Sequence, residues 1–226
     1  GGDAAGMSAA SKAKRVNGDL EIIIYEKGEY ISYSQCGLPY YISDVTKDKE
    51  KLVIKKPEDF EEKGIHVFTK HEVIKINERE KSVTVRDSNN NVFEEKYDVL
   101  LVATGADPKV PPVKGVDLQN IFTLKTIPDA EIIKEFVKRD GIENVVLIGG
   151  GYINVELIES MILLGKKVRI IQRPKTLLNI MDEEFGQMVH EEVEKHGGMV
   201  HTEETLEEII GKEKVEGVKT DKGEYP

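Results

Sequence analysis

The sequence contains one cysteine, Cys36, in a setting typical of a reactive thiol. It lies within ISYSQCGLPYYI, residues 31–42, ten residues after Glu26 at the end of an apolar run. Gly37 allows close backbone approach, and Pro39 suits the first turn of a helix. Unpaired N–H groups at a helix N-terminus favour the thiolate, the nucleophilic form of cysteine. Without such a context a lone cysteine is more often a small buried side chain. The choice between a reactive and a buried thiol therefore depends on the motifs in the rest of the chain.

A glycine-rich turn precedes this stretch. GGDAAG, residues 1–6, has glycines at the first and last positions of G-x-G-x-x-G. Residues 7–16 predict a helix with small residues on one face, and residues 20–25 predict a strand buried on both faces of a parallel sheet. The strand ends at Glu26, 20 residues after Gly6, which is the spacing at which a carboxylate binds an adenosine ribose. We therefore predict a dinucleotide at this turn.

A second strand–turn–helix–strand unit, NVVLIGGGYINVELIESMILLGKKVRIIQR, occupies the other half of the chain. We predict the turn at 149–151, the helix at 152–164 and the second strand at 168–171. The third motif position is Asn154, where a small residue normally lets helix and strand approach closely. We expect the asparagine to weaken that packing or to tilt the helix.

The position expected to be acidic in this second unit is occupied by Gln172, followed by Arg173. A glutamine can hydrogen-bond ribose hydroxyls without repelling a 2′-phosphate, and the arginine could pair with that phosphate. Both are also ordinary residues at a strand end. The choice between NADH and NADPH therefore stays open, with a lean towards tolerance of both.

The predicted fold class is α/β, with two Rossmann-like dinucleotide-binding domains at 1–112 and 113–226, the first carrying an antiparallel β-meander insertion. The proline-rich segment 106–115 is the predicted boundary. The remaining predicted elements are meander strands at 65–67, 72–76 and 82–86 with a turn at 88–91, a buried strand at 97–105, a helix at 128–139, a helix capped by Asp182 and ending near 196, and two final strands. We expect both ends to be cut, so that a first strand, a C-terminal FAD-contacting segment and a last strand lie outside this chain.

Composition narrows the class of partner. Lys plus Arg number 32 and Asp plus Glu 42, which gives a net charge of −10. This argues against nucleic acid and against an anionic membrane as partners. A single cysteine cannot form an internal disulfide, which is typical of the cytoplasm. No apolar run approaches the roughly 18 residues of a membrane span. The five histidines lack metal-ligand spacing, and we interpret His190 and His196 as surface residues of a helix.

Several stretches together resemble a known family. They are GGDAAGMSAASKAKR, EKGEYISYSQCGLPYYI, KHEVIKI, YDVLLVATGA, FTLKTIPDA and VVLIGGGYI. The chain resembles the single-cysteine branch of the flavin-dependent pyridine-nucleotide disulfide reductases. The Ser32-x-x-x-Cys36 spacing followed by GLPY is most similar to coenzyme A-disulfide reductases and to NAD(P)H-dependent persulfide and polysulfide reductases. NADH oxidases and peroxidases share the spacing but usually lack the GLPY continuation.

The resemblance implies three sets of binding residues. For FAD they are Gly1, Gly2, Gly6, Glu26, Lys27, Ser32, Val73, Ala103, Thr104 and Gly105. For NADH or NADPH they are Gly149, Gly151, Tyr152, Ile153, Glu156, Gln172 and Arg173. For coenzyme A, which the resemblance places at Cys36, they are Ser8, Lys12, Arg15, Ser32, Gln35 and Lys63. Two of these, Lys12 and Arg15, lie three apart on one predicted helix face, where they can meet a phosphate.

The resemblance also implies an activity. Electrons would pass from NAD(P)H through FAD to Cys36, the catalytic residue, which would reduce coenzyme A disulfide, a persulfide or a polysulfide. Two alternatives remain: an NADH oxidase or peroxidase that reduces oxygen or peroxide through a Cys36 sulfenic acid, and an inactive cofactor-binding fragment. We expect a cytoplasmic protein that is a homodimer in its full-length form.

Overall fold

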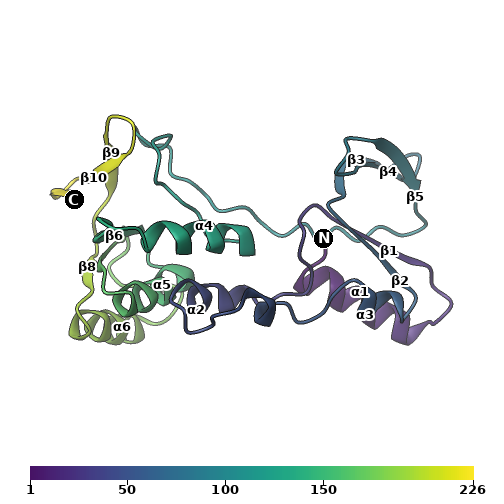
Figure 1. Cartoon of the computed structure of the whole chain (residues 1–226), viewed down its shortest axis with the longest axis horizontal. Coiled ribbons are helices and arrows are strands. Elements are labelled where there is room, and N and C mark those ends of the chain that lie inside the picture. The colour runs from purple at the N-terminus through teal and green to yellow at the C-terminus, as the bar shows by residue number, and fades with distance from the viewer. The chain divides into compact units, whose positions relative to one another are not determined.

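The computed structural model describes residues 1–226 and divides into two compact units. The first unit comprises residues 1–34 and 49–107, and the second comprises 35–48 and 108–226 (Figure 1). Residues 35–48, which include Cys36, thus group with the second unit. The functional domains predicted at 1–112 and 113–226 stay a prediction. No helix combines the length and the hydropathy needed to span a bilayer.

The first unit contains a parallel strand pair and a separate antiparallel sheet. Its elements are α1 (Ala4–Val16), β1 (Ile22–Glu26), η2 (Lys49–Leu52), α3 (Glu58–Glu61), β2 (Ile65–Thr69), β3 (Glu72–Asn77), β4 (Ser82–Arg86) and β5 (Val92–Lys96). The helix predicted at 7–16 and the strand predicted at 20–25 are confirmed as α1 and β1. Strand β1 pairs with β2 in parallel, with Ile24 opposite Val67. The core between these strands and the helices consists of Met7, Ala10, Ile24, Ile31, Phe60, Ile65 and Val67.

The prediction that residues 65–67 belong to the antiparallel meander is wrong. They form part of β2, which pairs with β1, while the antiparallel sheet has the order β3–β4–β5. The alternating pattern read from the sequence is the same for both sheet types, so it could not distinguish them. The connection between β1 and β2 determines that they pair in parallel. It is long and includes α3, and a crossover of this kind brings two strands together in the same direction.

The buried strand predicted at 97–105 is also absent. No strand is formed there, and Val99 is 88% exposed and Leu101 61% exposed. An apolar run becomes a buried strand only where neighbouring strands offer unpaired N–H and C=O groups. Within the first unit no strand pairs with this segment, so its backbone is left without a ladder.

The second unit contains the predicted strand–turn–helix–strand unit. Its elements are η1 (Gln35–Gly37), α2 (Leu38–Ile42), α4 (Ile127–Val137), β6 (Asn144–Ile148), α5 (Tyr152–Leu163), β7 (Lys167–Ile171), α6 (Glu183–Lys195), β8 (Met199–His201), β9 (Leu206–Gly211), β10 (Val215–Thr220) and β11 (Glu224–Tyr225). Strands β6, β7 and β8 form a parallel sheet in that order, and β9, β10 and β11 form an antiparallel one. Two strands were predicted after α6, and four are found because the chain folds back on itself at Gly211 and again before β11.

Two predictions about α6 need correction. Asp182 occupies the N-cap position, but its side chain makes no capping hydrogen bond. His196 is exposed as predicted, whereas His190 is mostly buried: only 17% of its side chain is exposed, and its Nδ1 has no hydrogen-bond partner. The sequence pattern of α6 could not reveal the burial of His190, because the side of the helix that is covered depends on which other elements pack against it.

A buried polar cluster joins β7, β8 and β10 to the C-terminal strand. Glu204, 3% exposed, accepts hydrogen bonds from Thr220 Oγ1 and from the Tyr225 hydroxyl, the latter at 2.7 Å. His201 Nδ1 lies 3.3 Å from Glu204 Oε2, and its Nε2 accepts from Arg169 Nε at 3.0 Å. Burial lowers the pKa of His201, and the charge of Arg169 lowers it further although Glu204 opposes this. The fold therefore favours neutral His201.

This cluster predicts a stability that falls in mild acid. Since the pKa of His201 is lower in the fold than the ordinary 6.5, the unfolded chain binds more protons below pH 6.5. The free energy of unfolding should then decrease from pH 6.5 to pH 5, by less than about 1.4 kcal/mol per pH unit, the limit for one proton. Urea unfolding across this range should show the decrease in the wild type and in His196→Gln. His201→Gln should flatten it, and an unchanged slope in that variant would contradict the assignment.

Candidate functional site

The first glycine turn is so tightly packed that Gly1 and Gly6 have no room for a side chain. A Cβ on Gly1 would lie 1.9 Å from the carbonyl oxygen of Ala103, and a Cβ on Gly6 would lie 1.9 Å from the carbonyl oxygen of Gly1. Both obstacles are backbone atoms, which cannot swing away as a side chain would. The structure thus brings Ala103 against the turn. Binding of FAD by these three residues stays a prediction.

Glu26 holds the turn from the end of β1. Its Oε2 accepts the N–H of Gly2 at 2.6 Å, and its Oε1 accepts the N–H of Gly28 at 2.7 Å. An ionised carboxylate has about four acceptor sites, so each oxygen can still accept a hydroxyl. Helix α1 begins within this turn, at Ala4, and its N-terminus has no side-chain cap. The turn therefore offers backbone N–H groups to an anion beside a carboxylate suited to ribose.

The other residues implied for the first cofactor also lie in the first unit, but they differ in setting. Ser32 has a left-handed backbone, with φ of 46°, and its N–H donates to the carbonyl oxygen of Gly2 at 2.9 Å. Lys27 Nζ lies 3.9 Å from a carboxylate oxygen of Asp107, and both side chains are mostly exposed. Val73 lies on β3, half-exposed, while Thr104 and Gly105 are exposed after Ala103. Ser32 alone among them contacts the turn through a hydrogen bond.

The second glycine turn is closed on one side and open on the other. Gly149 has a left-handed backbone, with φ of 95°. A Cβ on Gly150 would lie 2.8 Å from both Gln172 Cδ and Leu177 Cδ2. A Cβ on Gly151 would meet nothing within 4 Å, and α5 begins there without a side-chain cap. Space is therefore open beside Gly151 at the uncapped start of α5, where unpaired backbone N–H groups suit a pyrophosphate.

Gln172 supports this turn from the end of β7, as Glu26 supports the first. The side chain is 6% exposed; its Oε1 accepts the N–H of Gly150 at 2.6 Å, and its Nε2 donates to the carbonyl oxygen of Thr176 at 2.9 Å. Binding of a ribose by this amide stays a prediction, and it would have to compete with these two bonds.

Asn154 contributes more than the sequence suggested. Its Nδ2 donates to the carbonyl oxygens of Ile148 and Gly149, each at 2.8 Å, and so joins α5 to the end of β6. The expected loss of packing is therefore offset by two hydrogen bonds that a glycine or alanine could not make. The neighbouring Tyr152 and Ile153 are about half exposed. Glu156 lies one turn further along α5, half-buried.

Cys36 is a free and exposed thiol. It lies in the 3₁₀ turn η1, directly before α2, and Pro39 stands in the first turn of that helix as predicted. Gln35 beside it is exposed as well. The interpretation of Cys36 as a buried apolar side chain is thereby excluded, because its sulfur can be reached from solvent.

The segment that carries Cys36 is anchored within the second unit by contacts the sequence did not reveal. Ser160 Oγ, on α5, donates to the carbonyl oxygen of Pro39 at 2.9 Å. Lys134, on α4, places its Nζ 2.9 Å from Asp44 Oδ1 and 3.6 Å from the centre of the Tyr41 ring. Lys138, one helical turn further, pairs with the other oxygen of Asp44. In the sequence, the only indication of this anchor is that Lys134 and Lys138 lie four residues apart on one helix. That spacing does not identify Asp44 as their partner.

We expect Lys134→Met to loosen this anchor. The substitution keeps the apolar stem against Tyr41 and removes the charge, whose ion pair with Asp44 and contact with the ring are partly buried, so unfolding should be easier by about 1–2 kcal/mol. Hydrogen exchange of residues 38–44 should also become faster. Lys167→Met is the matched control, because Lys167 pairs with Glu143 in solvent and should change stability by less than about 0.5 kcal/mol. Equal effects of the two variants would contradict the anchor.

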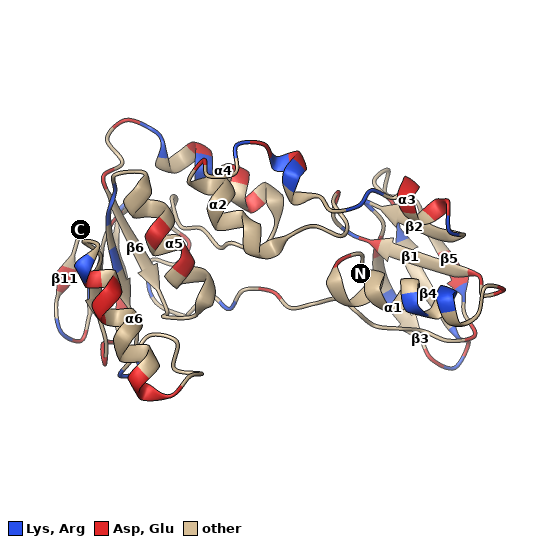
Figure 2. Ribbon diagram, turned by 90° about the horizontal axis from the view of Figure 1, so that it is seen from below, with Lys and Arg blue, Asp and Glu red and all other residues tan.

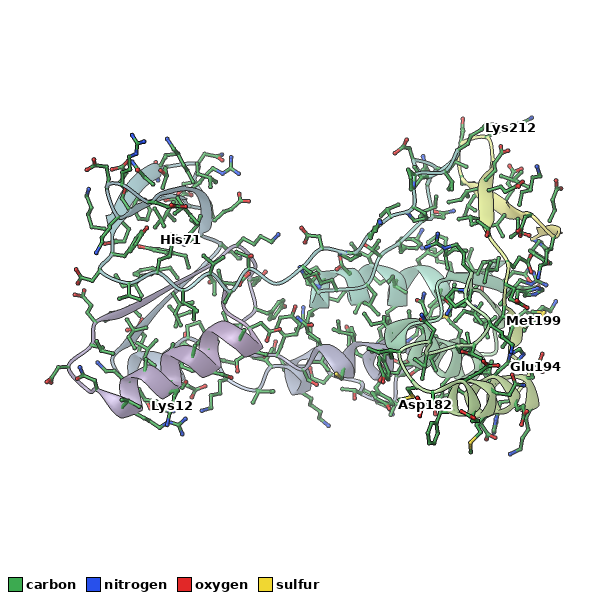
Figure 3. All side chains as sticks on the ribbon, turned by 180° about the vertical axis from the view of Figure 1, so that it is seen from behind. Lys12, His71, Asp182, Glu194, Met199 and Lys212 are labelled. Carbon is green, nitrogen blue, oxygen red and sulfur yellow. The ribbon has the colours of Figure 1, made fainter.

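The residues implied for coenzyme A fall on both units. Ser8, Lys12 and Arg15 are exposed on α1, spaced four and three apart along one face, and Figure 3 shows Lys12 extending outward from that helix. Lys63 is exposed after α3 in the same unit, and its proximity lowers the pKa of Lys55, a neighbour that sequence reasoning missed. Figure 2 shows basic residues at the end of α1. Gln35 and Cys36 belong to the second unit.

The family model described as pyridine nucleotide-disulphide oxidoreductase matches residues 1–225. The chain belongs to this family. Its α/β class, with both glycine turns at the starts of helices, is therefore that of a known enzyme fold.

Two curated relatives and one solved structure illustrate the likeness. The chain is 39% identical to the NAD(P)H sulfur oxidoreductase (CoA-dependent) of Pyrococcus furiosus, over all of this chain and 50% of that protein. It is 34% identical to the NADH oxidase of Methanocaldococcus jannaschii, over 98% of this chain and 50% of that one. The NAD-dependent persulfide reductase of A. fulgidus superposes with a TM-score of 0.93 at 31% identity, covering all of this chain and 43% of that one. The chain spans about half the length of the curated relatives it matches.

Family membership implies two cofactors, FAD and NADH or NADPH. The residues present fit both. Each glycine turn is followed by an uncapped helix of twelve or more residues, and each is held by a side chain at the end of the next strand, Glu26 in one case and Gln172 in the other. FAD would be held at the first turn and the nicotinamide dinucleotide at the second.

Proposed function

We propose that the protein containing this chain is a flavin-dependent oxidoreductase that passes electrons from NAD(P)H to Cys36, which reduces coenzyme A disulfide, a persulfide or a polysulfide. The observation that carries the proposal is the free, exposed thiol of Cys36 in a chain with two dinucleotide-type turns. The name of the Pyrococcus furiosus relative, a CoA-dependent sulfur oxidoreductase, supports the same substrate class.

The chemistry of Cys36 can be written as a balanced exchange. Its thiolate attacks one sulfur of coenzyme A disulfide, so that a Cys36–coenzyme A disulfide forms and one coenzyme A thiolate leaves. When bound, FAD would supply two electrons taken as hydride from NAD(P)H. Those electrons and one proton cleave the mixed disulfide, which releases the second coenzyme A as a thiol and restores the Cys36 thiolate. With a persulfide R–S–SH, the Cys36 thiolate attacks the outer sulfur and the thiolate R–S⁻ leaves. Two electrons then release that sulfur from Cys36 as hydrosulfide and restore the thiolate.

Other residues of the chain would bind and position the reactants. Lys12 and Arg15 on α1, with Lys63, supply exposed cations suited to the phosphates of coenzyme A. Gly151 leaves the start of α5 open to the pyrophosphate of NAD(P)H. Lys134 holds the segment that presents Cys36. We further propose that the full-length protein is a cytoplasmic homodimer.

A second function is favoured by the NADH oxidase among the relatives. In that case Cys36 would be oxidised by peroxide to a sulfenic acid, which two electrons and two protons would reduce to thiol and water. No coenzyme A adduct would form, and NADH would be consumed with oxygen or peroxide as acceptor. A third possibility is that this chain by itself binds cofactors without turning over.

One experiment separates these functions. The thiol-reduced chain is mixed with coenzyme A disulfide, and the released thiol and the protein mass are measured. The proposal predicts one equivalent of released thiol and a mass increase of one coenzyme A on Cys36. Addition of one oxygen with peroxide, and no reaction with the disulfide, would instead establish the oxidase or peroxidase. Flavin retention, measured by absorbance, tests whether the chain alone binds FAD.

A further inference from the structure

Four large apolar side chains are exposed together at the start of α6, in the second unit. This set, the α6 patch, consists of Ile180 (80% exposed), Met181 (41%), Phe185 (56%) and Met188 (63%). Phe185 and Met188 are three residues apart, so they lie on one side of the helix. Single exposed apolar residues are common, whereas a group of them with a polar border is typical of a surface that binds a partner.

The backbone that carries the α6 patch is held by contacts on its other side. Leu178 is buried, and its N–H donates to the carbonyl oxygen of Gly150 at 2.8 Å. The N–H of Met181 donates to the carbonyl oxygen of Leu178, also at 2.8 Å. A Cβ on Gly186 would lie 2.6 Å from the carbonyl oxygen of Leu177, so the helix is pressed against this loop. The buried side of α6 is therefore already occupied, and the patch lies on the opposite side.

Acidic side chains border the α6 patch. Residues 182–195 include six acids and one lysine, which gives 1 − 6 = −5, and Figure 2 shows acidic residues along α6. Three of the acids, Asp182, Glu184 and Glu191, form no ion pair, and Glu191 only accepts a hydrogen bond from a neighbouring glutamine at 3.2 Å. Glu184 lies four residues before Met188 and Glu191 three after it, so both flank that side chain. The border thus carries negative charge that no cation of the chain neutralises.

The charge of this border selects among the surfaces that could cover the patch. An anionic membrane would be repelled by the acids. A second copy related by a two-fold axis would bring the same patch, with Glu184 and Glu191, against itself, so like charges would meet. A basic amphipathic helix suits both features. Its apolar side chains can pack on the adaptable methionines, while its lysines extend apolar stems over the patch and reach the carboxylates with their ammonium groups.

We propose that the α6 patch binds a basic amphipathic helix of a partner protein. The apolar face of that helix covers Phe185 and Met188, and its cations pair with Glu184 and Glu191. The patch is separate from Cys36 and includes neither glycine turn, so this binding does not depend on the proposed redox function.

The test uses a synthetic peptide as the probe. It is a fluorescently labelled 14-residue peptide of leucine and lysine, with the leucines at helical spacing, and its anisotropy is measured as the 226-residue chain is added. We expect a Kd of about 10 μM or below, which rises with salt. A peptide with the same leucines but with glutamate in place of lysine should bind at least about tenfold more weakly.

Matched variants locate the binding surface. Phe185→Gln and Met188→Gln should each weaken binding of the leucine–lysine peptide about tenfold, because each loses an apolar contact that the peptide covers. Met188→Leu should stay within about threefold of the wild type, since it keeps the apolar volume. Val16→Gln, 72% exposed on α1, is the apolar control and should change affinity less than about twofold. Glu184→Gln should weaken binding about threefold, and Glu216→Gln, at an exposed position of β10, should have no such effect.

Several outcomes would overturn this proposal. Equal losses in Val16→Gln and Met188→Gln would show general attraction of the peptide to a negatively charged chain. Binding of the leucine–glutamate peptide as tight as that of the leucine–lysine peptide would remove the role of the acidic border. Sedimentation as a dimer that Met188→Gln dissociates would assign the patch to a second copy. Binding by this chain but not by the full-length protein would show that the rest of that protein covers the patch.

Discussion

Cys36→Ser should abolish the NAD(P)H-dependent reduction of coenzyme A disulfide, lowering kcat by about three orders of magnitude or more. A serine hydroxyl has no accessible anion near neutral pH and cannot form the mixed disulfide on which the exchange depends. Because Cys36 is the only cysteine of this chain, no second thiol in it can substitute. The measurements are thiol release with NAD(P)H consumption, and protein mass after mixing with coenzyme A disulfide.

A control distinguishes a lost nucleophile from a lost cofactor site. Reduction of an artificial electron acceptor draws electrons from the flavin without using the sulfur, so it reports whether the cofactors still bind. A Cys36→Ser protein that keeps this reaction but loses thiol release supports the assignment. Full disulfide reduction by the variant would show that the thiol is not the redox group, and the proposed function would have to be given up.

The parts of the fold that could be predicted are those decided by local sterics. The two glycine turns, α1, β1, α5 and β7 lie where the sequence places them. Glycine adopts a left-handed backbone such as that of Gly149 without steric cost, and a side chain would not fit where Gly6 approaches Gly1. Pro39 was expected in the first turn of a helix, and it is there. These requirements for glycine and proline involve only a few neighbouring residues or a single contact, so the sequence pattern reveals them.

What could not be predicted depends on partners far away in sequence. The salt bridge of Asp44 with Lys138 joins residues 94 apart, and neither side chain signals the other. The apolar residues around Leu101 have the composition of a buried strand, yet they form no ladder because strand formation needs a neighbour. Gln172 was correctly placed at a strand end, but its burial and its two backbone partners follow from packing rather than from spacing. Spacing thus predicted where these residues lie in the fold, whereas their hydrogen bonding could not be predicted from it.

The second large effect expected is that of Gly6→Ala on the first turn. The added methyl group would lie 1.9 Å from the carbonyl oxygen of Gly1 and 3.6 Å from Ala103 Cβ. Since the nearest obstacle is backbone, relief requires the turn to move, and with it the bond between Gly2 and Glu26 that orients the carboxylate. We expect a loss of about 3 kcal/mol or more in the free energy of unfolding, together with loss of bound flavin.

Gly18→Ala provides the matched control for this prediction, because a Cβ at Gly18 would meet nothing within 4 Å. That variant should be as stable as the wild type or slightly more so, since alanine restricts the unfolded chain. Urea unfolding and flavin absorbance on the two variants therefore separate a steric requirement of the turn from a general preference for glycine. If Gly6→Ala unfolded like Gly18→Ala and retained flavin, the first turn would not be the closely packed cradle that a pyrophosphate requires. Glu26 would then have to bind its ligand without that support.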